Sequence, residues 1–232
     1  FNRPAAKHAL NLAMYREVCA ALERASADVE TRCVVVTGSE SCFTAGNDLR
    51  DFQNLPLDSP DHPTLRFLRL LPTFPKPLLA AIDGPAVGIG TTMLLHFDLV
   101  YATARARFAM PFINLAVVPE AGSTLLLPQL CGHQRAAELL YFGEPFTAQT
   151  AREIGLVNDI LPEKTILEDV LARAAKLAKK SPSVLMATKS LLRAPQREAL
   201  DRVVEQEIAM FQEMLRGPEC RKILTSFFER KK

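Results

Sequence analysis

The stretch Gly84-Pro85-Ala86-Val87-Gly88-Ile89-Gly90 lies between an apolar run at 78–82, typical of a buried strand, and a helical pattern at 91–97. A glycine-flanked turn at the start of a helix leaves backbone N–H groups available to an anion or a developing oxyanion. A second turn of this kind lies within Cys42-Phe43-Thr44-Ala45-Gly46-Asn47-Asp48-Leu49, directly after a strand pattern at 33–37. Its small residues would let a carbonyl group approach the backbone closely. The two turns predict an oxyanion hole, although two tight turns that simply contain glycine fit the local sequence at least as well.

The glycine turn differs from nucleotide-binding motifs. A dinucleotide fingerprint needs a third glycine where this chain has Met93, and an acidic residue about twenty positions further on, where residues 108–112 contain none. The sequence also lacks Gly-Lys-Ser and Gly-Lys-Thr, so a phosphate loop is excluded. It has no Gly-x-Ser-x-Gly, which disfavours serine-triad chemistry, and His96 stands among leucines as a core histidine would.

The composition is that of an ordinary globular protein, with 232 residues, 48% of them hydrophobic and 23% charged. A formal net charge of +2 gives no reason to expect a nucleic-acid partner. Five cysteines without C-x-x-C spacing predict free thiols in a reducing compartment and no metal site. Without a signal peptide or an apolar run long enough for a bilayer, we expect no membrane partner and a cytoplasmic location. Because the chain begins at Phe1 rather than methionine, a peroxisomal or mitochondrial location stays open.

The pattern of elements changes along the chain. Strand and helix signals alternate up to about residue 160, and amphipathic helices follow at 164–180, 182–193 and 196–215. This order predicts an α/β core over residues 1–160 and a helical region over 161–232. The apolar stripes of these helices, for example Ile166, Val170, Ala174 and Leu177, exceed what a single core face should need, so we expect self-association through the helical region. Prolines at 56, 60 and 63 predict a mobile surface loop over 52–65.

Several motifs occur together in one order along nearly the whole chain. They are Asn2-Arg3-Pro4, Val35-Val36-Thr37-Gly38, Phe43-Thr44-Ala45-Gly46-Asn47-Asp48-Leu49, Lys76-Pro77-Leu78, Gly84-Pro85-Ala86-Val87-Gly88, Phe97-Asp98-Leu99-Val100-Tyr101-Ala102 and Phe146-Thr147-Ala148. In this order the chain resembles the enoyl-CoA hydratase/isomerase (crotonase) superfamily. The resemblance implies a spiral of ββα units with a helical C-terminal trimerisation region, and a homotrimer or dimer of trimers. It also implies an acyl-CoA thioester as substrate, no cofactor beyond the CoA of that substrate, and an oxyanion hole from the N–H groups of Ala45 and Ile89.

Two departures from the resemblance concern the catalytic acids. Hydratases of this superfamily carry two glutamates at positions that are Thr92 and Phe112 here. Adding water needs one group to activate the water and another to handle the proton at the alpha carbon, and neither side chain can do this. Glu120 instead stands where the peroxisomal-type Δ3,Δ2-enoyl-CoA isomerases keep their catalytic glutamate, so the resemblance implies a single-glutamate proton shuttle. Glu120 also precedes a helical stretch, where an acid is favoured by the helix dipole alone.

The resemblance suggests further substrate contacts. Lys7 and Ala9 match the adenine side, and Phe228 and Lys231 in the last helix could touch CoA from a neighbouring subunit. Phe67, Phe112 and Val118 are plausible walls of an apolar pocket, or simply core. They are accompanied by Asn47, which could orient the thioester or Glu120, or form an Asx turn. Two alternatives to the isomerase remain open, namely another crotonase reaction such as hydration or hydrolysis, and a non-catalytic CoA-binding module.

Overall fold

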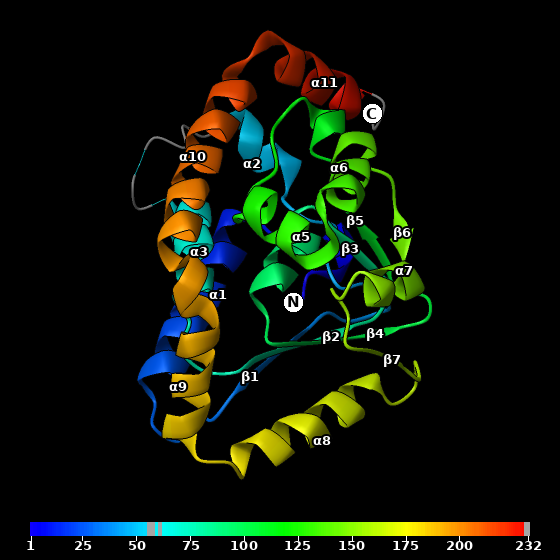
Figure 1. Cartoon of the computed structure of the whole chain (residues 1–232). Coiled ribbons are helices and arrows are strands. Elements are labelled where there is room, and N and C mark those ends of the chain that lie inside the picture. Colours follow the sequence, from blue (N-terminus) through cyan, green and yellow to red (C-terminus); the bar gives the residue numbers. More distant parts are fainter. Residues whose placement is uncertain (55–58, 60–61, 230–232) are drawn as a thin grey trace.

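The computed structural model describes residues 1–54, 59 and 62–229 (Figure 1). The expected loop over 52–65 lies partly outside the described residues. Its two ends are helical instead, since α2 covers Leu49–Asn54 and α3 covers Pro63–Leu70. Proline at the first position of α3 explains that start, because its missing N–H costs nothing there.

A parallel sheet with the strand order β1-β2-β4-β7 forms the centre of the molecule. All residues of β2 are buried, as its unbroken apolar sequence predicts. The patterns at 33–37, 78–82 and 99–102 are confirmed, whereas the sequence does not predict β7, whose three residues carry too short a pattern. The strands are β1 Val34–Thr37, β2 Leu78–Ile82, β4 Leu99–Thr103 and β7 Asp159–Leu161.

A second, smaller sheet brings the glycine stretch into register with its neighbours. Strand β3 (Pro85–Val87) pairs in parallel with β5 (Arg107–Ala109), which pairs antiparallel with β6 (Phe146–Thr147). Gly88 follows β3 with φ +56, a backbone conformation that favours glycine, and α4 (Ile89–Thr92) begins at the next residue. A glycine turn followed by a helix is therefore confirmed, whereas β3 lies within the stretch predicted as the turn, and the helical pattern at 91–97 is α4 followed by the 3-10 helix η3 (Met93–His96).

The helices cover the two sheets and fill the last third of the chain. Asn11 caps α1, since its Oδ1 accepts a hydrogen bond of 2.9 Å from the Met14 N–H. The α-helices not yet given are α1 Leu12–Ala27, α5 Ser123–Cys131, α6 His133–Phe142, α7 Ala148–Glu153, α8 Ile166–Ala178, α9 Pro182–Arg193, α10 Arg197–Arg216 and α11 Pro218–Glu229. The short 3-10 helices are η1 Pro4–Ala6, η2 Leu71–Thr73, η3 Met93–His96, η4 Ile113–Leu115 and η5 Ala194–Gln196.

Helix α10 packs on the α/β part of the same chain. It runs beside α3 along one side of the molecule (Figure 1), and its buried apolar residues belong to the same core as those of β2. The division into residues 1–160 and 161–232 thus separates two sequence patterns that share one hydrophobic core. The buried residues of α10 are Leu200, Val204, Glu207, Ile208, Phe211 and Leu215.

Helix α8 corrects the argument for self-association. Its residues Ile166, Val170 and Ala174 pack on the other face of the central sheet, against Leu79 and Tyr101 among others. These three residues of the stripe are therefore used within one chain, whereas Leu167 and Leu171 of the same helix are exposed. Self-association stays a prediction, which now rests on exposed apolar side chains of α9. These are Val184, Leu191 and Leu192.

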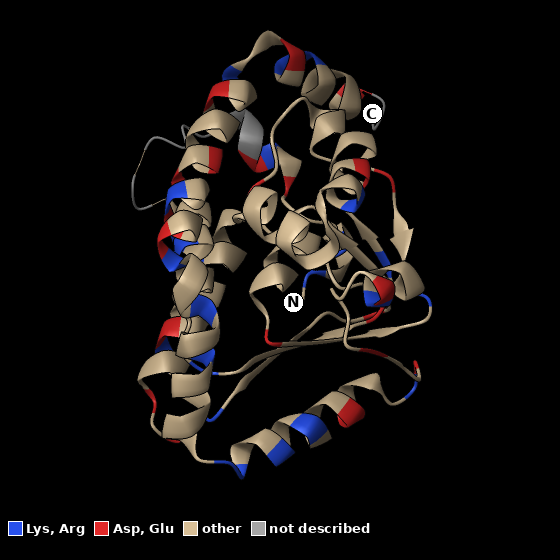
Figure 2. Ribbon diagram, viewed as in Figure 1, with Lys and Arg blue, Asp and Glu red and all other residues tan. Residues whose placement is uncertain are grey.

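The charged residues of the C-terminal helices differ from helix to helix. Acidic and basic residues both occur along α8, α10 and α11, whereas the charged residues of α9 are Lys189 and Arg193 (Figure 2). Of the helices in the described part of the chain, none has the length and apolar character needed to cross a bilayer. The five cysteines are free thiols.

Candidate active site

Glu120 lies in the segment between η4 and α5 and is 4% exposed. Its Oε1 accepts a hydrogen bond of 2.5 Å from the Thr92 hydroxyl, which α4 positions directly after the glycine turn. Burial raises the pKa of Glu120 from 4.5 to about 8, opposed by the Thr92 hydrogen bond and reinforced by the charge of Glu207. The carboxyl is therefore mostly protonated at pH 7 and ionises near pH 8.

The N-terminal end of α5 is capped by a different acid. Glu207 of α10 accepts hydrogen bonds from the Gly122 N–H at 2.6 Å and the Thr124 N–H at 2.9 Å. The side chain of Glu120 points to Thr92 and takes no part in this cap. The interpretation of Glu120 as a helix-end acid is thus disfavoured, because Glu207 fills that role.

The two predicted donor turns lie side by side. Thr44 and Ala86 form a parallel bridge, and the Val87 N–H donates to the Thr44 carbonyl at 3.0 Å. A Cβ on Gly46 would lie 2.6 Å from the Val87 carbonyl oxygen, so only glycine permits this close approach. The prediction that both turns build one site is consistent with this packing.

The donor predicted in the first turn needs a correction. The Ala45 N–H already donates to the Lys7 carbonyl at 2.9 Å, so it is not free to bind an oxyanion. Gly46 N–H is also occupied, by the Thr44 hydroxyl at 3.1 Å, and Asp48 N–H donates to Leu10. This leaves the Asn47 N–H, for which the described residues provide no partner.

The donor predicted in the second turn is the N–H of Ile89, and the structure leaves it available. Ile89 is the first residue of α4, where a helical N–H has no partner four residues earlier. Within residues 1–54, 59 and 62–229 no hydrogen bond to this N–H is found, whereas the neighbouring Gly88 N–H donates to Ala109 at 2.8 Å. Ile89 and Asn47 are therefore the pair of available backbone donors.

Glu120 and Asn47 both line one narrow cavity. Its volume of about 20 Å³ leaves room for about one water molecule, so the cavity is narrow in this structure. The Asn47 Oδ1 accepts a hydrogen bond from the Tyr15 hydroxyl, which fixes the amide; an Asx turn is not its role. The apolar walls come from α3 and α10. They are Leu65, Leu68, Ile208 and Phe211.

The predicted walls Phe67, Phe112 and Val118 do not line this cavity. Phe67 is buried against Tyr15, with ring centroids 5.4 Å apart. Phe112 belongs to the hydrophobic core, and Val118 is half-buried beside it. The helix period explains the difference on α3, because Leu65 and Leu68 share a face that Phe67 does not.

The predicted CoA contacts lie apart from one another in the sequence and are only partly described. Lys7 is exposed beside the first turn, where its carbonyl holds Ala45, and Ala9 is half-buried two residues on. Phe228 of α11 packs edge-to-face on Phe227 at 5.4 Å, and Lys231 lies outside the described residues. Their contact with CoA stays a prediction.

Sequence reasoning missed Glu207, His96 and Tyr15 as supports of the site. His96 is a buried core histidine, as expected, yet its Nε2 donates to the Ala121 carbonyl at 2.7 Å, next to Glu120. Burial lowers the pKa of His96 to about 4, so the ring is neutral. The signal for Glu207 was present, since an acid in the apolar stripe of a helix must find a buried partner.

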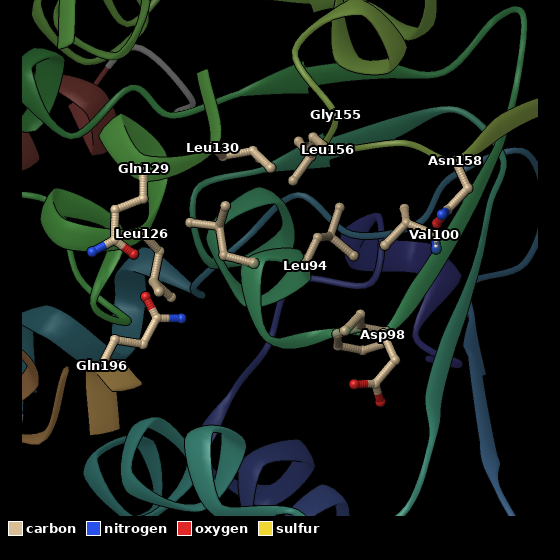
Figure 3. Close-up of a pocket in the computed structure, with 12 residues that line it drawn as sticks. Leu94, Asp98, Val100, Leu126, Gln129, Leu130, Gly155, Leu156, Asn158 and Gln196 are labelled. Carbon is tan, nitrogen blue, oxygen red and sulfur yellow. Dashed lines mark hydrogen bonds between the residues drawn. The ribbon is translucent and has the colours of Figure 1, made fainter. Parts of the chain in front are cut away.

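A second cavity of about 290 Å³ lies between η3, α5 and η5. Figure 3 shows leucine side chains pointing into it and Asp98 at its edge. Asp98 is the one carboxylate among the lining residues, and its Oδ2 is paired with Lys189 at 2.6 Å and with the Leu78 N–H at 2.8 Å. This cavity therefore lacks an available acid or base, and the cavity at Glu120 is the better candidate. Among the described residues, no cluster of metal-ligating side chains is found.

A buried carboxyl with a raised pKa lines a cavity together with Asn47 and is bound by Thr92 of α4, the helix that begins with the available Ile89 N–H. This is an arrangement expected of an acid–base enzyme that acts on an activated carbonyl compound. The chain belongs to the enoyl-CoA hydratase/isomerase family, whose model matches residues 1–232. The α/β fold is shared with solved members. The structure of Pseudomonas aeruginosa OdaA superposes with a TM-score of 0.94 at 44% identity, covering 98% of this chain and 92% of that one.

The named relatives include both isomerases and hydratases. Enoyl-CoA delta isomerase 2 of Rattus norvegicus is 38% identical over all of this chain, which spans 60% of the length of that relative. The 2,3-dehydroadipyl-CoA hydratase of Escherichia coli is 39% identical over 90% of this chain and 83% of its own length. An acyl-CoA thioester substrate is consistent with the family, and the reaction itself must be argued from the site.

Proposed function

We propose that this protein shifts the double bond of a 3-enoyl-CoA to the 2-position. Ionised Glu120 takes a proton from C2, and the electron pair of that C–H bond spreads over C2, C3, C4 and the thioester oxygen. The N–H groups of Asn47 and Ile89 hold the oxygen of the resulting dienolate. Protonated Glu120 then gives its proton to C4, which leaves the double bond between C2 and C3.

One observation carries this proposal: Glu120 is the single acid among the described residues that line the narrow cavity. A proton shuttle between two carbons of one substrate needs one base with a pKa near the working pH. Hydration needs a second group for the water, and the position that could supply it holds Thr92, whose hydroxyl is bound to Glu120.

We expect the purified protein to isomerise trans-3-enoyl-CoA at least about a hundredfold faster than it hydrates trans-2-enoyl-CoA, because one acid–base group is missing for hydration. Both reactions are followed by chromatography of the CoA products at equal enzyme concentration. A hydration rate comparable to the isomerisation rate would contradict the proposal and favour the hydratase alternative.

The remaining features of the proposal rest on the family. A non-catalytic CoA-binding module would have no use for a buried acid, whose desolvation costs stability. We propose a homotrimer or dimer of trimers, an acyl-CoA partner and a cytoplasmic location, with a peroxisomal or mitochondrial location as the alternative. CoA enters only as part of the substrate.

A further inference from the structure

Glu207 of α10 is 5% exposed and binds the turn that carries Glu120. Its two carboxylate oxygens accept hydrogen bonds from the Gly122 N–H at 2.6 Å, from the Thr124 N–H at 2.9 Å and from the Thr124 hydroxyl at 2.6 Å. A buried carboxylate with three donors is held in one geometry and holds its donors in turn. All three donors lie within four residues of Glu120.

The turn needs such a support. Ala121 has φ +61 and Gly122 φ +68, so two consecutive residues after Glu120 adopt the left-handed conformation. This conformation is unfavourable for alanine and persists only where surrounding contacts impose it. The contacts come from two sides, since His96 binds the Ala121 carbonyl and Glu207 binds the Gly122 N–H.

The same helix also forms part of the cavity wall. Ile208 and Phe211, one and four residues after Glu207, line the cavity together with Glu120. A single rigid element therefore touches both the acid-bearing turn and the space in which the acyl chain would lie.

We propose that Glu207 is a positioning residue that fixes the Glu120 turn to α10. This inference rests on the proposed function. The fixed turn keeps the Glu120 carboxyl within reach of both C2 and C4.

Three other groups that face Glu120 are neutral. Thr92 of α4 is neutral and donates to Glu120. His96 of η3 is neutral at working pH because burial lowers its pKa to about 4. Tyr15 of α1 is neutral as well, since burial and the nearby Glu120 raise its pKa.

The test compares Glu207→Gln with Glu205→Gln. Glu205 lies on the same helix, is exposed and pairs with Arg69 at 2.6 Å, so its substitution makes the same chemical change away from the turn. We expect Glu207→Gln to lower kcat about tenfold to a hundredfold through misplacement of Glu120. We expect the ascending limb of its pH–rate profile to move toward acid, because a displaced turn no longer buries Glu120 fully and burial is the main cause of its raised pKa. Glu205→Gln should keep the parent kcat and pH profile.

A direct titration separates failure of this inference from failure of the proposed function. Carboxyl ¹³C resonances of labelled glutamate, with Glu120 assigned by comparison with Glu120→Gln, give the pKa of Glu120 without any turnover. An inactive parent protein overturns the proposed function, whereas a lower Glu120 pKa in Glu207→Gln still supports the positioning of the turn. An active parent and a Glu207→Gln variant with the parent kcat, pH profile and Glu120 pKa overturn the inference.

Thr124→Val is the milder variant should Glu207→Gln fail to fold. It removes one of the three donors and keeps the carboxyl group of Glu207. We expect a several-fold lower kcat at unchanged KM. A folded Thr124→Val protein with parent kcat would overturn the positioning role.

Discussion

Glu120→Gln should abolish nearly all isomerase activity, with kcat lowered about a hundredfold to ten-thousandfold, the usual cost of losing a general base. Glutamine keeps the shape of the side chain and can still accept the Thr92 hydrogen bond. Because Glu120 is already mostly neutral at pH 7, the variant should bind acyl-CoA as the parent does. Calorimetry with a saturated acyl-CoA, which cannot react, measures that affinity.

The pH dependence gives a second measure of the same substitution. A base with a pKa of about 8 gives an ascending limb in kcat/KM of the parent that levels off above pH 8. The limb should be missing from the residual activity of Glu120→Gln. Asp98→Asn is the control, since it breaks the ion pair with Lys189 and should lower the Tm while the folded fraction keeps its kcat. A Glu120→Gln protein that retains most of the parent activity would refute Glu120 as the proton shuttle.

Ile89→Pro should lower kcat about a hundredfold to a thousandfold, which is the cost of removing one donor from an oxyanion hole. Proline lacks the N–H, and it is well tolerated at the first position of a helix, which is where Ile89 stands. The substitution thus removes the donor and disturbs the local fold little. Rates are compared at saturating 3-enoyl-CoA, because the developing charge exists only after the proton has left C2.

The matched control is Ile89→Val, which is about as large as proline and keeps the N–H. Ile89 is fully buried, so both variants lose apolar contacts, and Ile→Val changes of this kind cost about 0.5–1.5 kcal/mol of stability. Both variants should therefore lose stability, and only the proline variant should also have a lower kcat. Equal kcat values for the two variants would show that the Ile89 N–H does not contact the substrate oxygen.

The sequence predicts those parts of the fold that depend on local patterns. Strand β2 and helix α9 have the bounds of the patterns at 78–82 and 182–193 that predict them. Strand β7 has three residues, too few to form a recognisable strand pattern. The surface on which the apolar stripe of α8 packs depends on tertiary contacts, which the sequence of one helix face cannot specify. The placement of Glu120 in a buried site is likewise consistent with the order of motifs along the chain.

The site was harder to predict in its details because they depend on distant partners. Which N–H of the first turn is available depends on Lys7, whose carbonyl occupies Ala45 and leaves Asn47. The capping acid of α5 comes from α10, 85 residues from Gly122 along the chain. Local sequence favoured Glu120 for that role through the helix dipole, and a tertiary contact supplied Glu207 in its place.

The burial of Glu120 links the working pH of the protein to its resistance to unfolding. The folded pKa of about 8 lies above the ordinary value of 4.5, so this group contributes stability that is fully present below about pH 4.5 and is lost as the pH rises through 8. Deprotonation that activates the base therefore weakens the fold, and the reactive form is the less durable one. Thermal melts from pH 5 to 9 should show the parent losing Tm relative to Glu120→Gln, and parallel curves would contradict this linkage. A preparation stored at mildly acidic pH and assayed above pH 8 would combine the longest shelf life with the highest turnover.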